Sequence, residues 1–88
     1  MKRTAHQGDC ARVAKRALDA YCIATGANDD EGIIDLIADL GHFADRHDID
    51  FLDCAARAIG CWALERLGTD CEEPFPRVFI HIDDAGVS

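Results

Sequence analysis

The chain has 88 residues, of which 49% are hydrophobic and 30% are charged, and its formal net charge is −8. A chain of this size and composition is expected to form one globular domain, which excludes a disordered or fibrous protein. No apolar run reaches the ~18 residues that a membrane-spanning helix needs, and none follows the basic N-terminus as in a signal peptide, so we expect a cytoplasmic protein.

The first predicted helix covers residues 9–25. Its apolar residues recur at the i, i+3, i+4, i+7 spacing that marks one buried face of a helix. They are Cys10, Val13, Ala14, Ala17, Leu18, Tyr21 and Cys22. Gly26 is expected to end the helix, because glycine adopts the left-handed backbone of a helix C-terminus at little cost.

The second predicted helix covers residues 30–47. Asn28 is expected to cap its N-terminus, and Glu31 stands three residues later, as in a capping box. The expected buried face consists of Ile33, Leu36, Ile37, Leu40, Phe43 and Ala44. Gly41 lies inside this helix, where we expect it to permit close packing of another helix.

The third predicted helix covers residues 51–67, begins after Asp50 and ends before Gly68. Its expected buried face consists of Leu52, Ala55, Ile59, Trp62, Ala63 and Leu67. Gly60 is expected to permit close packing, as Gly41 does. Three helices with short connections predict a mainly α fold in one domain, a compact three-helix bundle followed by a C-terminal extended strand or strap.

The expected strand covers residues 77–83, in the stretch RVFIHIDD. Its alternate residues are apolar on both faces, so it needs cover on both sides. It can lie as a strap along the bundle, pair with the N-terminal segment, exchange with a second copy in a homodimer, or join the sheet of another protein.

The five cysteines and four histidines lack the close ligand pairs, such as C-x2-C, of structural zinc sites. No activated turn surrounds a candidate nucleophile, and no glycine-rich loop could hold a phosphate. We therefore expect no metal, no cofactor and no enzymatic activity, and we interpret most cysteines as small apolar core residues.

Charge is distributed unevenly along the chain. Most of its nine basic residues lie in residues 1–20, and most of its 17 acids follow. Glu31, Asp35 and Asp39 recur at i, i+4, i+8 on the second helix, which predicts an acidic edge along one side of it. The acidic surface is expected to continue through the next corner with Asp45, Asp48, Asp50 and Asp53. A secondary acidic group consists of Asp70, Glu72 and Glu73.

Two interpretations of this acidity remain open. The first is solubility, because a charged helix face is commonly only a solvated one. The second is imitation of nucleic acid: carboxylates one helical turn apart are spaced by ~5–6 Å, close to the spacing of phosphates along a strand. The net charge opposes direct nucleic-acid binding through the basic N-terminal residues, so a basic protein groove is the expected partner.

The block LIADLGHFADRHDIDF, residues 36–51, is followed by Ala55, Ala58, Trp62 and Glu65. It resembles a class of short prophage and plasmid proteins with the pattern L-x-A-D-L-x-H-[FY]-A-D-x-x-x-x-D-F, and the likeness covers about residues 33–66. Small acidic helical phage proteins include anti-CRISPR inhibitors, some of which occupy the DNA-binding groove of a surveillance complex as DNA mimics. The resemblance thus implies an inhibitor acting in the cytoplasm of a bacterial host.

We therefore expect a non-enzymatic phage or mobile-element protein that binds a host nucleic-acid-binding defence complex, such as a CRISPR surveillance complex, through its acidic surface. The alternative is a structural or accessory interaction protein, either a monomer or a homodimer through its C-terminal strand, whose acidity serves solubility.

Overall fold

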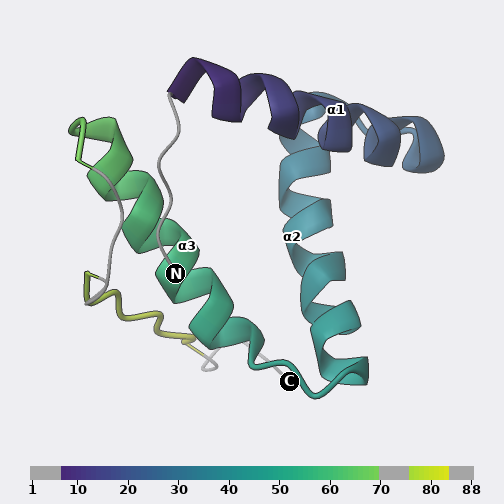
Figure 1. The fold of residues 1–88 in the computed structure, drawn as a ribbon. Coiled ribbons are helices and arrows are strands. Elements are labelled where there is room, and N and C mark those ends of the chain that lie inside the picture. Colours follow the sequence, from purple (N-terminus) through teal and green to yellow (C-terminus); the bar gives the residue numbers. More distant parts are fainter. Residues whose placement is uncertain (1–6, 70–75, 84–88) are drawn as a thin grey trace.

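The computed structural model describes residues 7–69 and 76–83. These residues contain three α-helices, α1 (Gln7–Thr25), α2 (Asp29–Arg46) and α3 (Phe51–Arg66) (Figure 1). The mainly α class is thus confirmed, and each helix begins and ends within two residues of its predicted bounds. Among these helices, none combines the length and the apolar content needed to cross a membrane.

The helix boundaries follow from local capping. The Asn28 side chain accepts a hydrogen bond from the backbone N–H of Glu31 at 3.0 Å, and Asp50 accepts one from the backbone N–H of Asp53 at 3.0 Å. Each bond satisfies a donor that the first turn of a helix leaves free. Gly26 and Gly68 both have φ +79°, the left-handed conformation predicted for the residues after α1 and α3.

The three helices form an open frame (Figure 1). The helix α1 lies across the N-terminal end of α2, while α3 leaves the C-terminal end of α2 and diverges from it. Contacts join α1 to α2 and α2 to α3. The radius of gyration is 14.7 Å, whereas a compact chain of this length is expected to have about 12 Å.

The helical, bundle-like arrangement is thus found as predicted, but the single chain is less compact than expected. Among the described residues, the only buried hydrophobic side chains are the small ones of Ala44 and Cys61, each 4% exposed. Larger residues that were expected in the core stay open to solvent, including Val13, Ile33, Leu40 and Trp62. These residues lie on the apolar faces that their spacing predicts, but the single chain does not cover those faces.

The predicted strand is not found: residues 76–83 have no regular secondary structure, and no strand occurs in the described parts of the chain. This segment runs beside α3 (Figure 1). At Gly60, an added Cβ would lie 3.3 Å from the backbone oxygen of Pro76 and 3.4 Å from its side chain. A close approach at Gly60 is thus found, but the neighbour is Pro76 of this segment and not, as the sequence had predicted, another helix.

Glycines also mark the places where the helices meet. A Cβ added at Gly32 of α2 would lie 2.6 Å from Cys22 Sγ and 3.1 Å from Leu18 Cδ1, both on α1. A Cβ added at Gly41 would lie 3.2 Å from the ring of Phe51 on α3. Close approach at Gly41 was predicted from the sequence, whereas the closer contact at Gly32 was not.

These two glycines give a matched pair of variants. In Gly32→Ala, overpacking against Cys22 costs about 1–3 kcal/mol and outweighs the gain of about 1 kcal/mol in helix propensity, so we expect a net loss near 1 kcal/mol. In Gly41→Ala, the cost of a small shift of the Phe51 ring offsets most of the same gain in helix propensity, so we expect stability within about 0.5 kcal/mol of the parent. Urea unfolding followed by circular dichroism measures both. A Gly32→Ala chain as stable as Gly41→Ala would contradict this account of the α1–α2 contact.

Candidate functional site

The candidate site is the acidic surface that runs along α2 and around the corner to α3. All seven of its predicted residues are exposed: Glu31, Asp35, Asp39, Asp45, Asp48, Asp50 and Asp53. At 3.6 residues per turn, Glu31, Asp35 and Asp39 drift slowly around one side of the helix, and Asp45 returns to that side nearly four turns after Glu31. The structure thus brings the α2 acids together as an edge opposite the apolar side of the helix.

Three of the seven acids interact with groups of the same chain. Asp39 accepts a hydrogen bond from the hydroxyl of Tyr21 on α1. Asp50 caps α3, and Asp53 forms an ion pair with Arg57 at 3.1 Å, one turn along the same helix. These contacts give Asp39, Asp50 and Asp53 structural roles.

The other four acids have no side-chain ion pair with any described residue: Glu31, Asp35, Asp45 and Asp48. Asp48 lies in the turn between α2 and α3 with φ 55°, a left-handed conformation that aspartate tolerates better than most residues. The carboxylates of this subset therefore remain available to cations of another molecule.

A shallow hollow of about 370 Å³ lies at the corner between α2 and α3. Its polar lining comes from His42, Asp45 and Asp50, and its apolar lining includes Phe51. Within the described ranges, no three histidine, cysteine or acidic side chains converge as metal ligands would. The hollow adds an acidic recess to the corner, which could receive a basic side chain of a partner.

The basic residues of α1 largely pair with acids of the same chain. Arg12 contacts Asp9 at 3.0 Å, and Lys15 contacts Asp19 at 2.5 Å and Asp29 at 3.6 Å. The hydrogen bond with Asp19 raises the pKa of Lys15. These exposed pairs contribute little to stability, but they reduce the positive potential that α1 would offer to a phosphate backbone.

The secondary acidic group of Asp70, Glu72 and Glu73 lies outside the described residues. Sequence reasoning also missed two features. One is the contact between Tyr21 and Asp39, since Tyr21 was assigned to an apolar face. The other is a groove of about 690 Å³ between α1 and α3, whose lining includes Ala14, Cys54 and Trp62.

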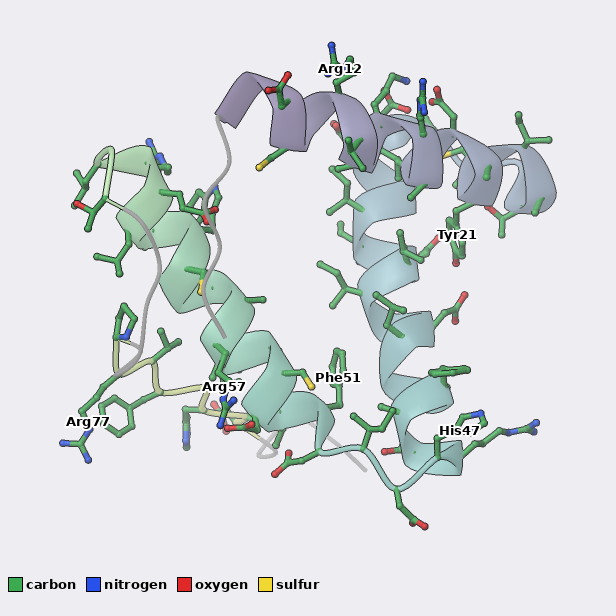
Figure 2. The ribbon with its side chains drawn as sticks, in the orientation of Figure 1. Arg12, Tyr21, His47, Phe51, Arg57 and Arg77 are labelled. Carbon is green, nitrogen blue, oxygen red and sulfur yellow. The ribbon has the colours of Figure 1, made fainter. Side chains whose placement is uncertain are left out.

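The Tyr21–Asp39 bond links α1 to α2 beside the acidic edge. In Figure 2, the Tyr21 side chain extends from α1 toward α2. The bond keeps the phenol protonated, which is the main reason why the pKa of Tyr21 is raised from 10.0 to about 12. Burial and the nearby charge of Asp39 act in the same direction.

This pKa shift predicts a pH dependence of stability. Because the pKa of Tyr21 is higher in the folded chain, its contribution is complete below pH 10.0 and is lost as the pH rises through about 12. Tyr21→Phe keeps the ring but removes the hydroxyl, so it should be less stable at neutral pH and should lack this part of the alkaline decline. Urea unfolding at a series of pH values tests this. The same alkaline decline in both chains would show that Tyr21 is not responsible for it.

A scan against protein-family models, a search of curated proteins and a search of solved structures each return no match for this chain.

Proposed function

We propose that this chain is a non-enzymatic protein of a phage or mobile element that binds a basic nucleic-acid groove in a host defence complex. A CRISPR surveillance complex is the foremost target, in line with the resemblance of residues 36–51 to short prophage and plasmid proteins. The acidic surface of α2 and its corner would take the place of nucleic-acid phosphates in that groove.

The supporting observation is a set of acids without ion-pair partners in the part of the chain that the structure describes. Glu31, Asp35 and Asp45 lie on one side of α2, are exposed, and have no ion pair among the described residues. Like charges one turn apart destabilise a helix by about 0.2–0.5 kcal/mol per pair. This cost applies to Glu31 and Asp35; the helix dipole stabilises Glu31 in the first turn, whereas it opposes the charge of Asp45 in the last turn. A cationic partner would relieve the repulsion.

The mechanism is competition for cations. Lys and Arg side chains of a nucleic-acid groove are placed to neutralise phosphates, and a rigid row of carboxylates can engage them without a sugar or a base. Such binding is steered over long range and weakens steeply as salt is added. Bound in this way, the chain would exclude the nucleic acid.

The experiment that tests the proposal is binding of the chain to a purified surveillance complex, with target DNA as competitor. Charge reversal at Glu31, Asp35 and Asp45 should abolish binding and restore DNA occupancy. Asp39 is left unchanged, because it holds Tyr21 and its replacement would disturb the fold.

A second candidate function is favoured by a separate observation, the solvent-exposed apolar side chains of α2 and α3. It is a structural or accessory interaction protein whose acidity serves solubility. Homodimer formation through a C-terminal strand was the expected route, but residues 76–83 form no strand. A stable assembly that binds no basic-groove protein would favour this function over the inhibitor.

A further inference from the structure

An uncovered apolar surface spans α2 and α3. On α2, Ile33, Ile37 and Leu40 recur at i, i+4, i+7 and are 50%, 50% and 49% exposed. The helix α3 adds residues that are equally open: Leu52, Ile59 and Trp62. We call these six residues the open apolar side. Large apolar side chains that gather on two neighbouring helices and stay open to solvent mark a site of contact with another protein.

The chain exposes more surface than a compact monomer of its size. The chain exposes 7206 Å², whereas a compact folded monomer of 9.6 kDa is expected to expose about 5,100 Å². The excess is about 2,100 Å², and an obligate dimer buries about 1,000–2,500 Å² on each partner. An excess of this size over the whole chain is large enough to supply one subunit's share of a permanent interface.

The charges of the chain are compatible with a copy of itself as the partner. The acidic edge, Glu31, Asp35 and Asp45, lies on the other side of α2 from Ile33 and Ile37, so burial of the apolar side leaves the acids in water.

We propose that a second copy of this chain packs on the open apolar side. The two α2–α3 pairs would then share one core as a four-helix assembly with twofold symmetry, in which the same residues contact one another from both sides. The bundle that the apolar spacing predicts would form between two chains instead of within one. This inference does not depend on the proposed function, because the acidic edges stay outside the interface.

Sedimentation equilibrium of the full chain tests the assembly directly. We expect a mass of twice 9.6 kDa, and a melting midpoint that rises over about a hundredfold range of protein concentration, because unfolding is coupled to dissociation. A monomeric mass across that range, with an unchanging midpoint, would overturn the proposal. It would mean that the chain closes on itself or awaits a foreign partner.

A pair of variants locates the interface. Ile37→Asp places a charge on the open apolar side, and twofold symmetry doubles its effect, so the dissociation constant should rise at least about a hundredfold. Ile23→Asp is the matched control, since Ile23 lies at the end of α1 and is already 85% exposed, and it should leave the dimer intact. If Ile37→Asp stays dimeric, or if Ile23→Asp dissociates equally, this surface is not the interface. If Ile37→Asp fails to fold, the mass and the concentration dependence of the melting midpoint of the parent chain still decide whether a dimer forms.

Discussion

Replacement of Glu31, Asp35 and Asp45 by lysine is expected to lower the affinity for a basic nucleic-acid groove by at least about a thousandfold. Close charge pairs across an interface are worth about 1.5 kcal/mol or more each, so three reversals reach that factor. The three side chains are exposed, and none pairs with another described residue, so the fold should tolerate the change. Titration against a purified surveillance complex, with circular dichroism to check helicity, measures the effect.

The matched control reverses the secondary acidic group, Asp70, Glu72 and Glu73, which changes the net charge equally but leaves the α2 edge intact. We expect this control to keep most of its affinity. Equal loss in both triple variants would show that overall charge, and not the α2 edge, drives binding. Retained inhibition in the α2 variant would rule out the mimic mechanism outright.

Salt gives an independent check on the same mechanism. A groove built for phosphate loses affinity as salt rises, with a slope that reflects the number of neutralised charges. The parent chain should show a steep decrease, and the α2 variant should show a shallow one. A partner held through the open apolar side would instead bind with little dependence on salt.

The sequence predicted the local structure well, because capping is encoded within a few residues. Asn28 and Asp50 act on donors three residues ahead, and Gly26 and Gly68 adopt the backbone conformation that glycine favours. Each of these effects depends only on neighbouring groups. Helix boundaries are therefore predictable even where nothing is known of the tertiary structure.

The arrangement of the helices was not predictable in the same way. The spacing of Ile33, Ile37 and Leu40 shows that one side of α2 requires cover, but it does not show which surface provides that cover. The expectation of a compact bundle assumed that the same chain does so. The helices approach closely at Gly32, where a missing side chain leaves no apolar pattern to read, and at Gly41, where the sequence predicted close packing but not which residue provides it.

The acidic site was predictable as a set of residues but not as a set of roles. The periodicity of Glu31 and Asp35 predicted a shared edge, and both residues are exposed on α2. The hydroxyl of Tyr21, which donates a hydrogen bond to Asp39, comes from a different helix. No local spacing in the sequence relates Tyr21 to Asp39. Such contacts distinguish structural acids from those available to a partner.

Phe51→Ala is expected to remove about 2 kcal/mol from the free energy of unfolding. Phe51 begins α3 and points toward α2 (Figure 2), where its ring packs over Gly41. Truncation of a fully buried phenylalanine costs about 3–5 kcal/mol, and the half-buried ring of Phe51 should account for roughly half of that. The free energy of unfolding of a domain of this size is about 4–13 kcal/mol in total, so urea unfolding should detect the change readily.

Phe79→Ala is the matched control, since it removes the same ring from a position that is 85% exposed. Its ring faces the guanidinium of Arg77 at 5.7 Å, a contact worth only about 0.5 kcal/mol at an exposed site, so stability should hardly change. Equal losses in the two variants would show that the Phe51 ring does not fix the corner. If the Phe51 ring does fix the angle between α2 and α3, Phe51→Ala should also weaken self-association. A symmetric core requires the two helices to present their apolar sides at one fixed angle. Phe51→Ala would then lower both the stability of the corner between α2 and α3 and the affinity of one chain for another.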